Sequence, residues 1–239
     1  MNQNPGILGK KIGMTQLFDD KGEVQRVTVI QASCLVLGKR TLEKDGYSAV
    51  VLGIGERKEK HTTKPVAGQY KNGTYKEAAT TAKKIIRELR MSAAEVAKLE
   101  VGKKMPLEQI FQIGQFVDAQ AKTLGRGFSG VIRRHHFAGF VQTHGTHEYF
   151  RHGGSIGTNM TPGRTLPGVK MPGQHGNKQR TALNLTVVKI IAEDDLVLVA
   201  GAVPGAANGT VILRGAVKKK DAGRPGEKIT GAPSKKKKA

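Results

Sequence analysis

Residues 182–203 read ALNLTVVKIIAEDDLVLVAGAV, two apolar runs on either side of three consecutive acidic residues. Both runs are rich in β-branched residues, and a cluster of charged residues between two such runs is typical of a turn. The stretch therefore predicts a β-hairpin that turns at residues 193–195. Similar short runs, bounded by Gly or charged residues, occur at 24–32, 47–55, 116–123 and 209–217. Short strands with Gly-rich turns favour a barrel or a sandwich over a layered α/β sheet.

One segment, residues 62–105, departs from this strand pattern. Thr74 stands three residues before Glu77, and apolar residues follow at helical spacing as far as Leu89. This pattern indicates a capping box ahead of an amphipathic helix, and Ser92 with Glu95 repeats it. We therefore expect a small helical insertion at 62–105. The β-barrel body is then assigned to residues 1–61, 106–124 and 181–217.

The chain of 239 residues is strongly basic, with 40 Lys and Arg against 19 Asp and Glu, a net charge of +21. Residues 126–180 hold eight of these cations and one acid, Glu148, which leaves +7. Residues 218–239 hold nine cations and two acids, again +7. Charge of this size repels itself unless a polyanion neutralises it; nucleic acid is the obvious polyanion, and an anionic membrane surface is the rival. We expect residues 218–239 to be a Lys-rich disordered tail that adds electrostatic affinity.

Residues 125–180 have the composition of an extended basic arm. Twelve Gly, three Pro and six His fall between Gly125 and Gly176, without a sustained helical or strand period. Phe and Tyr side chains alternate with imidazoles between Phe137 and Phe150, and arginines lie on either side of this stretch. Cations can bind phosphates, rings can stack on bases and Gly allows close backbone approach, as an RNA-binding segment requires. A flexible surface loop is the plainer interpretation.

The same arm carries Gly125, Gly127 and Gly130 in the spacing G-x-G-x-x-G. A dinucleotide-binding fingerprint needs a strand before it, a helix after it and an acid about 20 residues on. The segment VIRRHHFAGF that follows has no apolar helical face, and Glu148 does not end an apolar second strand. We therefore prefer a backbone turn against phosphates to a nucleotide-dependent enzyme.

Two other kinds of chemistry are weaker still. His144, His147 and His152 suggest a metal site, but H-x-x-H without a helix or nearby carboxylates gives poor tetrahedral geometry. Ser129 and Ser155 lie near His residues, yet almost no acid is available to orient a base. We expect no enzyme activity, no cofactor, no metal and no small-molecule substrate.

The sequence also predicts where the protein works. Its clearest apolar run, residues 196–203, is far shorter than a membrane span, and its first residues lack the apolar region of a signal peptide. The single Cys34 allows no intrachain disulfide and is interpreted as a small core residue. We therefore expect a cytoplasmic protein without membrane partners.

Five motifs give the chain a resemblance to a known family. They are GILGKKIGMTQLFDDKGEVQRVTVI at 6–30, GRGFSGVIRRHHF at 125–137, THGTHEYFRHGGSIGTNMTPGR at 143–164, GVKMPGQHGN at 168–177 and GAVPGAANGTVILRGAVK at 201–218. In this order they resemble the bacterial form of universal large-subunit ribosomal protein three. The resemblance implies a six-stranded Greek-key barrel and a long arm that reaches toward the peptidyl-transferase centre. It also implies primary binding to 23S rRNA near its 3′ end, nucleation of assembly, and contacts with ribosomal proteins fourteen and nineteen.

We interpret the chain as a non-catalytic structural protein of the large ribosomal subunit that binds rRNA. The arm cations are expected on phosphates, Lys10 and Lys11 at the base of the arm, and residues 155–163 at its tip. The RNA-contacting residues predicted in this way are Lys10, Lys11, Arg126, Arg133, Arg134, His135, His136, His144, Arg151, His152, Ser155, Asn159, Arg164, Lys170, His175, Lys178 and Arg180. A DNA-compacting or RNA-chaperone protein is the alternative that keeps the charge without needing one RNA architecture.

Overall fold

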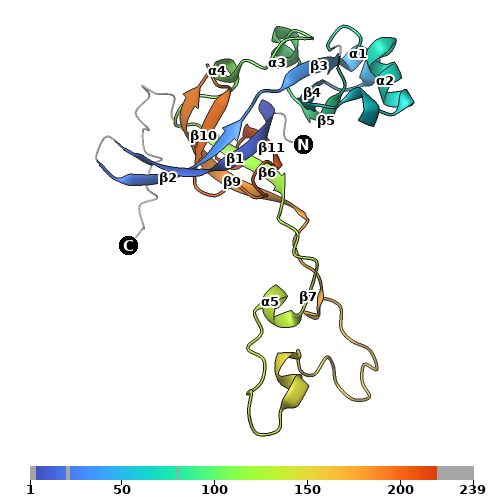
Figure 1. Ribbon diagram of the computed structural model, residues 1–239, viewed down its shortest axis with the longest axis vertical. Helices are drawn as coiled ribbons and strands as arrows, with labels where there is room; N and C mark the ends of the chain where they lie inside the picture. The colour runs from blue at the N-terminus through green and yellow to red at the C-terminus, as the bar shows by residue number, and fades with distance from the viewer. Residues whose placement is uncertain (1–3, 20–21, 80, 220–239) are drawn as a thin grey trace, which may run out of the picture. The chain divides into compact units, whose positions relative to one another are not determined.

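The computed structural model describes residues 4–19, 22–79 and 81–219, and the chain forms two compact units (Figure 1). The described residues up to 122 and from 179 onward form one, here called the barrel unit, and residues 123–178 form the other, here called the arm unit. The predicted Lys-rich tail at 218–239 lies outside the described residues, apart from its first two.

Six strands form a closed antiparallel barrel in the order β1-β11-β6-β9-β10-β2. Their bounds are Gly6–Phe18 for β1, Val24–Gln31 for β2, Phe116–Lys122 for β6, Gln179–Ile191 for β9, Leu196–Ala200 for β10 and Thr210–Gly215 for β11. The predicted six-stranded barrel is confirmed. So is the hairpin at residues 182–203, because β9 pairs with β10 across a turn at 192–195.

A second sheet of three antiparallel strands has the order β3-β4-β5, with bounds Leu35–Arg40, Ala49–Glu56 and Lys83–Arg90. The strand expected at 47–55 is therefore present as β4, but it belongs to this sheet and not to the barrel. Short helices complete the barrel unit: α1 at Leu42–Asp45, η1 at Glu59–His61, α2 at Lys64–Lys71, α3 at Ala93–Lys98 and α4 at Leu107–Ile110.

The amphipathic helix expected after Thr74 is wrong, since residues 83–90 form β5. The physical reason lies in β4, whose residues 49–54 are all buried. β3 pairs with one edge of β4, so the backbone groups on its other edge need hydrogen-bond partners from another strand. In the β4–β5 register Val50 lies opposite Leu89 and Ile54 opposite Ile85, so the apolar residues that matched a helix serve a strand equally well. Tertiary pairing thus overrode the helical spacing. The second predicted helix does begin where expected, with Ser92 as the N-cap of α3.

One hydrophobic core runs through the barrel and the small sheet. It includes Leu8 and Val199 from the barrel, Val50 from the sheet and the fully buried Phe111 from the loop after α4. Cys34 lies in this core, as predicted, and burial raises the pKa of its thiol to about 11. The thiol is therefore uncharged at neutral pH and acts as a small apolar side chain.

Asp118 is a buried carboxylate at the point where β6 and β9 lose their regular register. It accepts the backbone N–H of Asn184 at 2.9 Å and that of Val217 at 3.1 Å. We expect Asp118→Ala to lower the free energy of unfolding by about 3 kcal/mol, because both amides lose a charged acceptor in the interior. Urea denaturation measures this, with Asp194→Ala in the exposed hairpin turn as the control. A loss below about 1 kcal/mol would contradict the assigned role.

Candidate nucleic-acid interface

The arm unit begins and ends in two chain segments that run side by side, residues 123–130 and 171–178, here called the stalk. Backbone hydrogen bonds join Thr123 N–H to Lys178 O, Arg126 N–H to His175 O and His175 N–H to Gly127 O, each at 2.9 Å. The strands β7 (Phe128–Ser129) and β8 (Gly173–Gln174) continue this pairing. The stalk therefore fixes the side chains that it carries relative to one another.

A short helix, α5 at Val131–His135, follows Gly130 directly. The segment for which the sequence analysis found no apolar helical face thus does begin with a short helix. With five residues, however, α5 is shorter than a crossover helix, and the barrel strands that flank β6 are both antiparallel to it. A dinucleotide site needs a parallel βαβ unit, which these described strands do not form.

Basic side chains gather around His175 on the stalk. Burial lowers the pKa of the His175 imidazole below its ordinary value, and electrostatic interaction with Arg126, Arg133, Arg134 and His136 lowers it further. The lowered pKa favours the neutral imidazole, so the cations at this place are the three guanidinium groups, which are positively charged by their chemistry. Such a concentration of cations has the electrostatics of a phosphate-binding surface.

Two of the predicted arm residues serve the fold of the arm unit itself. Arg134 donates from Nη1 to the carbonyl of Met171 at 2.6 Å, and His135 Nε2 lies 3.0 Å from the same oxygen. Gly173 provides the space for this guanidinium, since a Cβ there would lie 2.6 Å from Arg134 Nη1. These contacts hold α5 against the returning chain.

Lys11 likewise has protein partners within the barrel unit. Its ammonium donates to the carbonyls of Val203 at 2.7 Å and Gly205 at 3.3 Å. A phosphate would have to compete with these carbonyls for the Lys11 ammonium. This contact gives Lys11 a part in closing the loop before β11.

The arm aromatics pack first against their own neighbours. Phe140 and Tyr149 have ring centroids 5.5 Å apart, and Tyr149 and His152 are 4.5 Å apart. Tyr149 and His152 belong to or adjoin η2, a 3-10 helix at His147–Arg151. The rings keep exposed faces as well, because Phe140 is 46% and Tyr149 55% exposed. They therefore form a small cluster that can still present a ring to a base.

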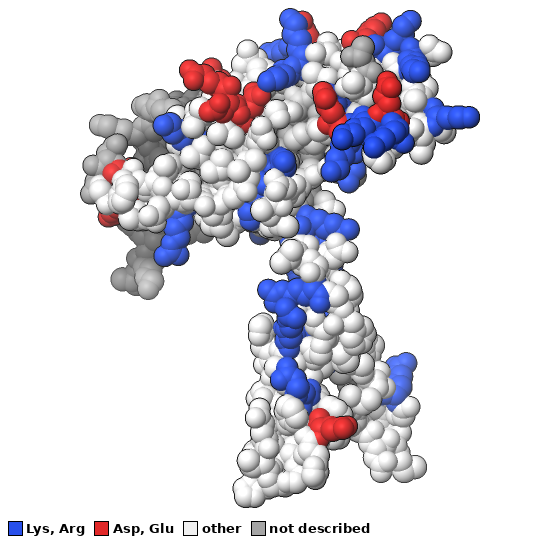
Figure 2. Space-filling model, in the orientation of Figure 1, with Lys and Arg blue, Asp and Glu red and all other residues white. Residues whose placement is uncertain are grey.

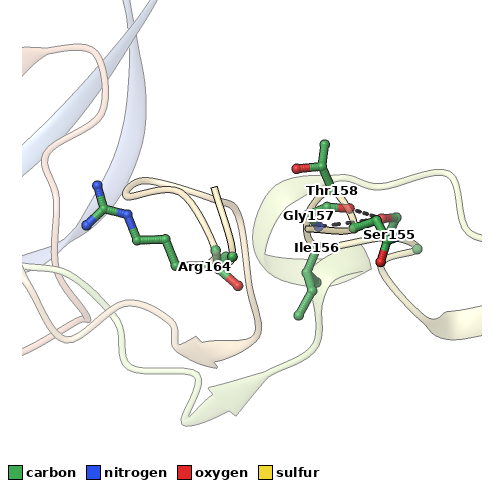
Figure 3. A pocket seen from close by; sticks show the side chains of 9 residues that line it. Ser155, Ile156, Gly157, Thr158 and Arg164 are labelled. Atoms are coloured by element: carbon green, nitrogen blue, oxygen red, sulfur yellow. Dashed lines mark hydrogen bonds between the residues drawn. The ribbon is translucent and has the colours of Figure 1, made fainter. Parts of the chain in front are cut away.

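An open pocket of about 470 Å³ lies in the loop predicted as the tip (Figure 3). Its lining consists of Gly154, Ser155, Ile156, Gly157, Thr158, Asn159, Gly163, Arg164 and Thr165. The loop is held locally: Ser155 Oγ donates to Gly157 O at 2.9 Å, and Thr158 Oγ1 to Thr161 O at 2.6 Å. In Figure 3 the Arg164 side chain extends away from Ser155 and Thr158. Backbone groups, hydroxyls and one cation suit a sugar or a phosphate better than an apolar ligand.

The arm cations have no acidic partners among the described residues. The five ion pairs found there all join side chains of the barrel unit, such as Lys104 with Asp195 at 2.7 Å. Figure 2 shows several basic side chains on the arm unit but few acidic atoms. The arm unit therefore carries charge that its own fold does not neutralise.

The structure divides the predicted RNA-contacting residues by exposure. Those that are exposed are Arg126, Arg133, His136, His144, Arg151, His152, Ser155, Asn159, Arg164, Lys170, Lys178 and Arg180. Those that are partly buried are Lys10, Lys11, Arg134, His135 and His175. The sequence analysis missed Phe128, which is 78% exposed beside the basic cluster. No local sequence signal marked it, because its exposure depends on the two-residue strand β7, in which Ser129 is buried and Phe128 is not.

Neither a metal site nor a membrane-spanning helix is found in the part of the chain that is described. No three His, Cys, Asp or Glu side chains within it gather as a metal site requires. None of its helices has the length and apolar character that would carry it through a bilayer.

Comparison with known proteins assigns the chain to a family. The family model for ribosomal protein L3 matches residues 60–196. The large ribosomal subunit protein uL3 of Sorangium cellulosum is 63% identical over 220 residues, which are 92% of this chain and 93% of the relative. The chain belongs to the ribosomal protein L3 family. The uL3 proteins of Myxococcus xanthus, at 47% over 215 residues, and of Dichelobacter nodosus, at 42% over 214 residues, each cover 89% of the chain.

Membership in this family makes the chain a structural constituent of the large ribosomal subunit. It confirms the family predicted from the five motifs. The family role is structural and not enzymatic, in keeping with an arm whose 126–180 segment holds a single carboxylate. The stalk cluster and the tip loop are then the surfaces whose partners need to be identified.

Proposed function

We propose that the arm unit binds 23S rRNA through the phosphates of its backbone. The observation that carries this proposal is the group of unneutralised cations around His175, together with five further cations along the arm and its exit strand. Those five are Arg151, Arg164, Lys170, Lys178 and Arg180, and all are exposed. A structural constituent of an RNA-rich particle places such cations next to phosphates, where they release counterions and gain affinity.

The resemblance supplies the finer parts of the proposal. The chain binds near the 3′ end of 23S rRNA, helps to nucleate subunit assembly and directs residues 155–163 toward the peptidyl-transferase centre in the cytoplasmic ribosome. Ribosomal proteins fourteen and nineteen are its protein neighbours. The protein performs no catalytic step itself, and its contribution is to fix the RNA. The open pocket at residues 154–165 supports a contact with a single nucleotide at the tip.

Salt titration tests the phosphate contacts. With about eight arm cations on phosphates, we expect the logarithm of the rRNA association constant to fall against the logarithm of salt with a slope between about −5 and −7. Replacing Arg126 and Arg133 together by Gln should make that slope shallower by about two, because each removed phosphate contact removes about one unit. Filter binding to a 23S fragment at several salt concentrations measures both slopes.

The matched control is Lys104→Gln, because the Lys104 ammonium is already paired with Asp195 at 2.7 Å. Its slope should equal that of the unchanged protein. A slope near zero for the unchanged protein would contradict the proposal. Equal competition by duplex DNA of the same length would instead favour a DNA-compacting protein.

A further inference from the structure

The hairpin of β1 and β2 continues beyond the closed barrel. β11 pairs with β1 only at residues 6–10, and β10 pairs with β2 only at residues 27–31. β1 and β2 pair with each other as far as Phe18 and Val24, so residues 24–26 of β2 and the β1 residues opposite them have no third strand beside them in the register. In Figure 1 this pair of strands extends away from the rest of the barrel unit. We call residues 13–19 and 22–26 the hairpin tip.

One face of the hairpin tip presents apolar side chains to solvent. Phe18 lies directly opposite Val24, and Met14 lies four residues before Phe18 on the same face of β1. Phe18 is 72%, Val24 53% and Met14 52% exposed. An isolated two-stranded hairpin is marginally stable in water, and exposed apolar side chains at its end add little stability unless a partner buries them.

The charge of the hairpin tip differs from that of the chain as a whole. Residues 12–26 contain Asp19, Asp20 and Glu23 against Lys21 and Arg26, a net charge of −1 in a chain of +21. Figure 2 shows acidic atoms at this end of the barrel unit and a largely uncharged surface beside them. An acidic end with an apolar face repels phosphates and suits a cationic protein surface.

We propose that the hairpin tip is a protein-docking surface, and that its occupant is a basic protein of the same large subunit. The partner provides an apolar pocket for Phe18 and Val24 and places Lys or Arg side chains near Asp19 and Glu23. An aromatic anchor surrounded by polar contacts is the usual form of the energetically dominant part of an interface. This inference assigns a surface to the protein neighbours proposed above and rests on that part of the proposed function, but it does not depend on rRNA binding by the arm.

Photo-crosslinking within purified large subunits tests the proposal. A benzophenone-bearing phenylalanine analogue replaces Phe18 in the full chain, the subunits are assembled and irradiated, and the adducts are mapped by mass spectrometry. We expect an adduct to one protein, in a peptide rich in Lys or Arg. The control carries the analogue at Gln25, which pairs with Leu17 on the opposite face, and should give little of that adduct. An adduct to rRNA or to a second copy of this chain, or no adduct, would overturn the proposal.

A second variant measures the energetic role of the same face. Phe18→Ser combined with Val24→Ser should weaken binding of the crosslinked protein to this chain by at least about tenfold. Both positions lie beyond the closed barrel, so thermal unfolding of the barrel unit should remain unchanged. The salt slope for rRNA binding should also remain unchanged, which separates failure of this inference from failure of the rRNA proposal. Unchanged affinity for the partner would show that this face does not carry the contact.

Discussion

A chain in which two Gly replace residues 128–175 should bind rRNA about 10³ to 10⁴ times more weakly at 0.1 M salt, while its barrel unit still unfolds cooperatively. The deletion removes five cations, Arg133, Arg134, Arg151, Arg164 and Lys170. The barrel strands and the core residues that they bury lie outside the deleted range. Because His175 N–H donates to Gly127 O at 2.9 Å, the ends to be joined are close together.

Filter binding and urea denaturation measure the two halves of this prediction. The control keeps the arm and replaces the same five cations by Gln. If charge alone binds the RNA, the control should lose as much affinity as the deletion. A smaller loss assigns the remainder to the arm rings and the pocket at 154–165. Loss of the cooperative transition in the deleted chain would show instead that the arm unit belongs to the core.

The barrel was predictable because its strands carry a local signal. β-branched residues with turn residues on either side appear in β2, β6, β9, β10 and β11, and the acidic turn at 193–195 marks the hairpin of β9 and β10. The division of the strands into two sheets was not predictable in this way. β4 resembles a barrel strand in sequence, and only its pairing with β3 and β5 places it in the second sheet.

The composition of the sequence indicated which segment forms the candidate site, but not which contacts its side chains make. Charge and Gly content identified the arm segment, and 12 of the 17 predicted contact residues are exposed. The sequence could not reveal that Arg134 and His135 bind the carbonyl of Met171, or that Lys11 binds Val203 and Gly205. These bonds join residues far apart in the chain. They therefore depend on the folded backbone and leave no local pattern.

The stalk depends on a glycine at position 176. Gly176 has φ +70°, and a Cβ there would lie 2.0 Å from the carbonyl oxygen of Leu124 on the facing segment. Gly176→Ala therefore places a non-glycine residue in the left-handed region and adds a backbone clash. Together these destabilise the paired stalk by about 3 kcal/mol. We expect the backbone pairing of Arg126 with His175 to open, and amide exchange at His175 to become about a hundredfold faster.

The rRNA affinity of Gly176→Ala should fall with the pairing, because the stalk holds Arg126, Arg133 and Arg134 around His175. A fall of about tenfold corresponds to losing one or two fixed phosphate contacts while the cations themselves remain. The matched control is Gly168→Ala. Gly168 also has a positive φ, +85°, but no described heavy atom lies within 4 Å of a Cβ there, so only the conformational cost applies. If both variants change exchange and affinity equally, the clash with Leu124 is unimportant. If Gly176→Ala alone loses affinity, and its salt slope becomes shallower by about one or two although no cation has been removed, the alignment of the stalk has been lost and not its charge.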